Sequence, residues 1–138
     1  MSIPGSTDAR LFYRCARQRF DESKVLRKAD QTTGAVYLAG YGIECMLKAL
    51  ILNLLPEMKQ GEAILEFRGS QAHDYHWLRK KYIQKGGSQI SNELKHGFTL
   101  VFAWSTEMRY VPGTMKDTEA DAFLKIAEDF FQWADGRL

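Results

Sequence analysis

The stretch Val36-Tyr-Leu-Ala-Gly-Tyr-Gly-Ile-Glu-Cys-Met-Leu-Lys-Ala-Leu-Ile-Leu52 decides the fold of this chain. It is apolar on nearly every side of a helix and is interrupted by one acid and one base, Glu44 and Lys48. A helix without a polar face of its own must be surrounded by other helices. The stretch therefore predicts a helical bundle in which residues 31–55 form the most buried helix.

Length and composition indicate an ordinary globular protein. The 138 residues suffice for one hydrophobic core, so we expect a single domain over residues 1–138. The apolar fraction of 45% and the charged fraction of 26% argue against disorder, and a net charge of +2 does not indicate a nucleic-acid binder. Cys15 and Cys45 lie in apolar helical patterns, and we interpret them as buried, reduced thiols.

The N-terminus and the longest apolar segment bear on localisation. The first residues, Met1-Ser-Ile-Pro-Gly-Ser, lack the basic and apolar regions of a signal peptide. The apolar segment from Ala35 to Leu55 contains Glu44, Lys48 and Asn53, so we expect no membrane span. We therefore expect a cytoplasmic protein.

Helical periodicity continues on both sides of the central segment. We expect helices over about 8–29, 31–55, 74–84 and 88–106 and from 117 onward, and the pattern at 62–67 allows one more short helix. No segment alternates apolar and polar residues as a strand does. The fold class that follows is all-α, an up-and-down bundle of four to five helices. The core side of the first helix should carry Leu11, Phe12, Cys15, Ala16, Phe20 and Leu26.

Glu44 and Lys48, one helical turn apart, are the first candidate site residues. The common arrangement is an intrahelical ion pair that is partly exposed where two helices meet. The alternative is that Glu44 faces a cleft, as functional acids in apolar surroundings do. Small residues on the same segment predict a closely packed neighbouring helix: Gly34, Ala35, Ala39, Gly40 and Gly42.

The segment His73-Asp-Tyr-His76 is the second candidate. Its side chains can bind a metal, but a fourth ligand and a nearby cysteine are missing from the sequence, so we expect no metal site. The simpler interpretation is that His73 or Asp74 caps the following helix, while three side chains pack inward, namely Tyr75, Leu78 and Tyr82. Arg68 and His73 also fit an Arg-x-x-x-x-His spacing, which by itself is a weak indication of a catalytic pair.

Arg109 and Tyr110, near the expected end of the fourth helix, are the third candidate. Arg109 could bind a phosphate or a carboxylate, or it could hydrogen-bond the free carbonyls at the helix end. We interpret two basic stripes as solvated faces unless they meet in space, in which case RNA or nucleotide binding becomes plausible: Arg10-Arg14-Arg17 and Arg79-Lys80-Lys81.

Taken in order, these motifs resemble the HEPN family of small helical-bundle proteins. The residues that carry the resemblance are Tyr37 to Ile51, then His73-Asp-Tyr-His-Trp-Leu78, and finally Met108-Arg-Tyr-Val-Pro112. In the family, a helix resembling Ala-Gly-x-x-x-Glu-x-x-Leu-Lys is followed by a His-Asp-x-x-x-Leu segment and an Arg-Tyr corner. The resemblance covers about residues 10–135.

The resemblance implies a bundle of four or five helices that usually dimerises, with one of two activities and no cofactor. Many members are metal-independent endoribonucleases with a late Arg-x-x-x-x-His motif, often in toxin–antitoxin systems. Others are non-catalytic partners of small nucleotidyltransferases, or bind nucleotides or RNA. In the ribonucleases the arginine falls near Arg109, and here Thr114 stands where the histidine would be needed. Threonine is no base at neutral pH, which argues against catalysis through that motif.

We therefore expect a non-catalytic HEPN-like domain that binds a nucleotide, RNA or a nucleotidyltransferase-type partner protein. The expected cleft is lined by Glu44, Lys48, His73, Arg109 and Tyr110. The first alternative is an endoribonuclease toxin with a displaced site, in which His73 is the acid or base and Arg68 or Arg109 steadies the phosphorane. The second is a structural module whose basic first helix contacts an acidic partner.

A homodimer through the fourth or last helix is also expected, because aromatic side chains look more abundant than the core of a small bundle requires. The residues concerned are Phe98, Phe102, Trp104, Phe123, Phe130, Phe131 and Trp133.

Overall fold

The structure, a computed structural model, describes residues 3–102 and 112–138, without the side chains of residues 100–102. Over these ranges the chain forms six α-helices and one 3-10 helix, and no strand is present in them. They are α1 (Thr7–Lys28), α2 (Thr32–Asn53), α3 (Glu57–Glu66), η1 (Ser70–His73), α4 (Tyr75–Gln84), α5 (Asn92–Phe102) and α6 (Asp117–Asp135). The all-α bundle is confirmed, and the additional helix is α3, which begins earlier than the segment 62–67 that the sequence suggested.

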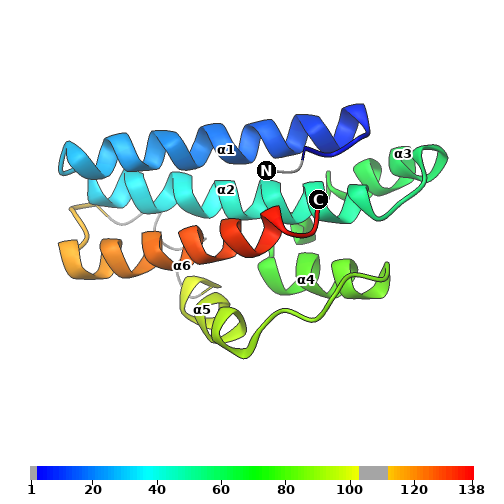
Figure 1. Cartoon of the computed structure of the whole chain (residues 1–138). Coiled ribbons are helices and arrows are strands. Elements are labelled where there is room, and N and C mark those ends of the chain that lie inside the picture. The colour runs from blue at the N-terminus through cyan, green and yellow to red at the C-terminus, as the bar shows by residue number, and fades with distance from the viewer. Residues whose placement is uncertain (1–2, 103–111) are drawn as a thin grey trace.

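The helices are arranged around α2, as Figure 1 shows. After a short turn at residues 29–31, α2 runs back antiparallel along α1. The last helix, α6, packs along α2, whereas α4 lies on the side of α2 away from α1 and α5 packs against α6. The N-terminal ends of α1 and α4 are fixed by caps: the Ser6 side chain accepts a hydrogen bond from the backbone of Ala9, and the Asp74 side chain accepts two from the start of α4.

The central position of α2 follows from its composition. From Gly42 to Leu52 every residue of the helix is buried. By length and apolar composition α2 could cross a membrane, but 78% of its apolar window is buried against the other helices, as in the core helix of a bundle. Gly42 shows why small residues are needed here: a Cβ atom at this position would lie 3.1 Å from both the Ala16 carbonyl oxygen and the Phe131 ring.

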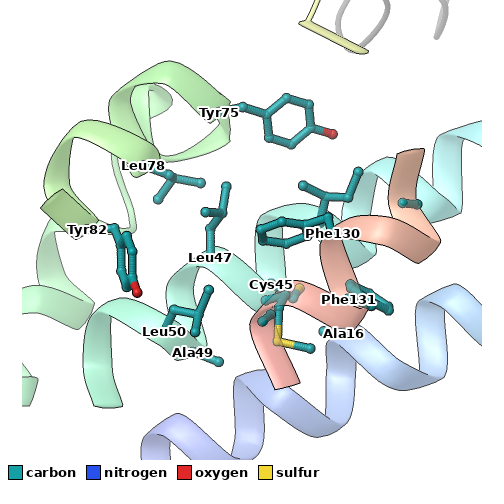
Figure 2. Packing of buried hydrophobic residues seen from close by; sticks show 14 of the residues in the cluster. Ala16, Cys45, Leu47, Ala49, Leu50, Tyr75, Leu78, Tyr82, Phe130 and Phe131 are labelled. Carbon is teal, nitrogen blue, oxygen red and sulfur yellow. The ribbon is translucent and has the colours of Figure 1, made fainter. Parts of the chain in front are cut away.

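The core between α2 and its neighbours is shown close up in Figure 2. Phe130 and Phe131 from α6 and Leu78 from α4 converge on the side chains of α2, among them Leu47. The predicted inward packing of the α4 residues is confirmed, since Tyr75, Leu78 and Tyr82 are all buried.

The same packing corrects the argument for a dimer. Four of the aromatic residues that looked surplus are buried within the chain's own core, namely Phe98, Phe123, Phe130 and Phe131. Trp133 is half-buried and packs against Phe130 and Tyr82. Phe102 and Trp104 have side chains outside the described residues. The core of the bundle therefore takes up these described aromatic side chains, and their abundance does not indicate an interface.

The buried face of α1 agrees with the prediction at Ala16 and Phe20 and differs from it elsewhere. It consists of Ala9, Tyr13, Ala16, Phe20 and Ser23, whereas Leu11 is 58% exposed. Phe12, Cys15 and Leu26 are only half-buried. Around Ala16, α1 approaches α2 closely, since its carbonyl oxygen would lie 3.1 Å from a Cβ atom at Gly42, and large side chains on this face would prevent such an approach.

Candidate functional site

Three titratable side chains from two elements meet on one side of α2. The Lys48 Nζ donates a hydrogen bond to Glu44 Oε2 over 2.8 Å, and Glu44 Oε1 lies 3.1 Å from His73 Nδ1. Glu44 and Lys48 are 6% and 5% exposed, whereas the His73 side chain is 47% exposed. We call these three residues the Glu44 cluster. It links a buried ion pair to an imidazole that solvent can reach.

Local structure explains how the three side chains come together. Glu44 and Lys48 are one turn apart on α2 and therefore share a face. His73 ends η1, directly before Asp74, which caps α4 by accepting hydrogen bonds from the backbone of His76 and Trp77 over 2.8 and 3.3 Å. The cap fixes the turn from η1 into α4 and so holds His73 against Glu44.

The wall beside Lys48 is apolar. Its Nζ lies 5.6 Å from the centroid of the Phe67 ring, and Phe67 in turn makes an edge contact with Phe12 of α1 at 5.7 Å. An ammonium group near an aromatic face gains electrostatic attraction, which partly replaces lost hydration. Nothing in the sequence pattern singled out Phe67, because it follows α3 and no periodicity links it to α2.

The predicted ion pair between Glu44 and Lys48 is confirmed, but its partial exposure is wrong. Both groups are buried because Phe67 covers Lys48 and η1 brings His73 over Glu44. Burial of a charge is costly unless it is paired and hydrogen-bonded. Both carboxylate oxygens of Glu44 have such a partner, so the pair meets this requirement.

Cys45 follows Glu44 in the chain, and the charges around it affect the pKa of its thiol. Burial raises the pKa of its thiol to about 12, and the neighbouring Glu44 charge acts in the same direction, while Lys48 and Arg19 oppose it. The thiol therefore remains protonated at neutral pH and is no nucleophile. Cys15 and Cys45 are both free, as the sequence predicted.

The other candidate residues are not brought into the Glu44 cluster by the described structure. Arg68 is exposed on the loop between α3 and η1. Thr114, which replaces the histidine of the late motif, is exposed before α6. Arg109 and Tyr110 lie outside the described residues, so their expected place in the cleft stays a prediction.

Arg17 and Lys81, one residue from each basic stripe, have ion-pair partners, and the two stripes do not meet. On α1, Arg17 pairs with Asp135, Lys24 with Glu128 and Arg27 with Asp121, so this side of the helix is held to α6 by ion pairs. Lys81 of the second stripe pairs with Glu66 over 2.6 Å. The stripes lie on α1 and α4, on opposite sides of α2 (Figure 1). This arrangement argues against a continuous basic surface formed by the two stripes.

A cavity of about 420 Å³ lies elsewhere, between α5 and α6. It is lined by Ser91, Glu93, Leu94, Lys125, Ile126, Asp129 and Trp133, none of which the sequence analysis had selected as a binding residue. Within the described ranges, the acidic, histidine and cysteine side chains form no group of three or more that could hold a metal ion.

The chain belongs to the HEPN domain family, whose model matches residues 9–137. The match covers nearly the whole chain and confirms the resemblance that the sequence motifs indicated. Membership supports a role connected with nucleotides or RNA. No match was found among curated proteins or among solved structures.

Proposed function

We propose that this HEPN domain binds a phosphate group of RNA or of a nucleotide at the Glu44 cluster and does not cleave it. The observation that carries the proposal is the hydrogen-bonded chain from buried Lys48 through Glu44 to half-exposed His73. Lys48 neutralises the Glu44 carboxylate, so a phosphate approaching His73 does not meet an uncompensated negative charge.

The imidazole of His73 is held in one orientation. Because Glu44 contacts Nδ1, the other ring nitrogen, Nε2, is left to bind a ligand. Arg68, exposed five residues earlier in the chain, is available to add a second positive charge when a ligand binds. A fixed imidazole loses little conformational entropy on binding, which favours affinity.

A non-catalytic role is preferred because the late Arg-x-x-x-x-His motif is absent. Cleavage of RNA through the 2′-hydroxyl requires a base, an acid and stabilisation of the phosphorane. Thr114 supplies neither acid nor base at neutral pH.

One observation favours the alternative of a metal-independent endoribonuclease. A buried carboxylate that holds Nδ1 favours the tautomer with its proton on that nitrogen, which leaves Nε2 free to accept a proton. In that case His73 would act as the base and Arg68 would steady the phosphorane.

Binding is tested with a fluorescently labelled single-stranded RNA, a mononucleotide and inorganic phosphate. We expect His73→Ala to weaken RNA binding about tenfold, the factor that corresponds to losing one hydrogen bond to a charged group. His96→Ala is the matched control, because His96 is an exposed histidine on α5 outside the Glu44 cluster. Equal affinities of wild type and His73→Ala would contradict the proposal.

Cleavage is tested by incubating the same RNA with the protein in the presence of a metal chelator. The binding proposal expects intact RNA. Metal-independent cleavage that disappears in both His73→Ala and Arg68→Ala, but persists in His96→Ala, would establish the endoribonuclease alternative instead.

We further propose, from family membership alone, that the protein forms a homodimer or acts with a nucleotidyltransferase-type partner. Light scattering at micromolar concentration tests the dimer, and a monomer there would count against it.

A further inference from the structure

The guanidinium of Arg19 differs from the other hydrogen-bonded arginines in the described part of the chain. Arg10, Arg17, Arg27 and Arg137 each donate a hydrogen bond from Nε to an oxygen atom. The Nε of Arg19 is buried and has no acceptor among the described residues. A buried donor without an acceptor is costly, and such groups call for an explanation.

The neighbouring donor of Arg19 is only loosely held. Its Nη2 donates to Glu22 Oε1 over 2.9 Å, and the two side chains are 33% and 42% exposed. Nε and Nη2 form one edge of the guanidinium, which matches two oxygens of a phosphate or carboxylate. Arg27 shows the filled arrangement in this protein, because its Nε and Nη2 reach the two Asp121 oxygens at 2.6 and 3.2 Å.

Glu22 fills only half of this edge of Arg19, because it contacts Nη2 and leaves Nε without an acceptor. An oxyanion that replaced Glu22 would accept from both Nη2 and Nε and so satisfy the buried donor. A ligand oxyanion can therefore accept one more hydrogen bond at this edge than Glu22 does, which favours displacement of Glu22.

Arg19 also lies near the Glu44 cluster. Two neighbours of Arg19 on α1, Ala16 and Phe20, lie close to Gly42 of α2, since a Cβ atom at Gly42 would lie 3.1 Å from the Ala16 carbonyl oxygen and 3.6 Å from the Phe20 Cβ. The charges of Arg19, Glu44 and Lys48 all act on the Cys45 thiol. Arg19 of α1 therefore lies near Cys45 of α2, and His73 of η1 contacts the neighbouring Glu44. On α1, Arg19 belongs to a row of half-buried side chains, which consists of Phe12, Cys15, Arg19, Glu22 and Leu26.

We infer that Arg19 is a second phosphate-binding residue, which exchanges Glu22 for a ligand oxyanion and extends the site across α2 from His73 to α1. The inference rests on the proposed function, since it assigns Arg19 to the same phosphate-bearing ligand. Glu22 then acts as an internal competitor that occupies the arginine when the ligand is absent.

Competition between Glu22 and the ligand for Arg19 predicts that substitutions of the two residues change RNA affinity in opposite directions. We expect Arg19→Gln to weaken binding of the labelled single-stranded RNA about tenfold. It should also lower the slope of log affinity against log salt by about 0.7, the value for one phosphate contact on a single strand. Glu22→Gln should instead tighten binding, by about threefold, because a partly exposed ion pair no longer competes. A purely structural role for the Arg19–Glu22 pair cannot produce this reversal.

Arg14→Gln is the matched control, because Arg14 is an exposed arginine on the same helix and the substitution removes the same charge. Inorganic phosphate and a mononucleotide are titrated as competitors, so that a site for RNA is distinguished from a site for a free phosphate compound. Thermal melts of every variant report whether it is folded. If Arg19→Gln does not fold, the inference is tested by Glu22→Gln alone: tighter RNA binding supports it, and unchanged or weaker binding overturns it.

The outcomes separate this inference from the proposed function. If His73→Ala weakens binding while Arg19→Gln and Glu22→Gln bind like wild type, the Arg19 inference is overturned and the proposed function stands. Equal losses in Arg19→Gln and Arg14→Gln would overturn it too, because the loss would then reflect net charge. If His73→Ala and Arg19→Gln both bind like wild type, both proposals fail.

Discussion

The free energy of the buried ion pair can be tested by removing one partner at a time. Glu44→Gln keeps the size of the side chain but leaves the Lys48 ammonium, which is 5% exposed, without an anion. Removing one partner of a buried pair costs roughly 3–5 kcal/mol of unfolding free energy. Because the glutamine amide oxygen can still accept from Lys48, we expect a loss of about 3 kcal/mol, a large part of the roughly 5–15 kcal/mol typical of a domain.

The contacts of Glu44 and Lys48 also predict which variant loses more unfolding free energy. Lys48→Met should cost less unfolding free energy than Glu44→Gln, because Glu44 keeps its contact with the half-exposed His73 side chain. The double variant Glu44→Gln/Lys48→Met should recover much of the loss, since no buried charge then remains unpaired.

The assay is urea unfolding followed by circular dichroism, with Asp129→Asn as the control. Lys125 and Asp129 form an ion pair with the same four-residue spacing on α6, but their side chains are 71% and 44% exposed, so this change should be nearly neutral. If Glu44→Gln is as neutral as Asp129→Asn, Lys48 is not desolvated in solution and the argument for a buried cluster fails. If Glu44→Gln strongly destabilises the protein and none of the tested ligands binds the wild type, the Glu44 cluster has a structural role only.

Three further predictions concern packing, thiol chemistry and acid sensitivity. Gly42→Ala should destabilise the protein by about 1–3 kcal/mol through overpacking against α1 and α6. Gly61→Ala, at a helical position with open space around it, should stabilise the protein by about 0.5–1 kcal/mol in the same urea assay. Burial raises the pKa of Cys45 to about 12, so any stabilisation from its protonated thiol is complete below the ordinary thiol pKa and is lost only as pH rises toward that value. Iodoacetamide at mildly alkaline pH should therefore label half-buried Cys15 before Cys45 in peptide maps, and equal labelling rates would refute the burial argument. The hydrogen bond from Arg27 lowers the pKa of the Asp121 carboxyl, so its stabilisation is present above the ordinary carboxyl pKa and is lost as pH falls through the lowered value. The stability difference between wild type and Asp121→Asn should therefore shrink on acidification, and a constant difference across that range would contradict the prediction.

The sequence by itself determined the helical class and the central helix. Residues 36–52 are apolar on nearly every side of a helix but include Glu44 and Lys48, a pattern that predicts enclosure by other helices, and periodicity placed the flanking helices to within a few residues. The four-residue spacing of Glu44 and Lys48 was enough to predict their ion pair, because that contact lies within a single helix. The cap at Asp74 was equally local and equally predictable.

Tertiary structure alone decided which side chains from different elements meet. Periodicity fixes the faces of a helix but not its rotation against a neighbour, and so Leu11 was assigned to the core although it is 58% exposed, whereas the buried Ala9 and Tyr13 were not assigned to it. The partners of Lys48 and Glu44 outside α2, Phe67 and His73, follow segments whose course depends on α3 and η1. The unfilled edge of Arg19 is likewise invisible in sequence, because a missing acceptor is a property of packing in three dimensions.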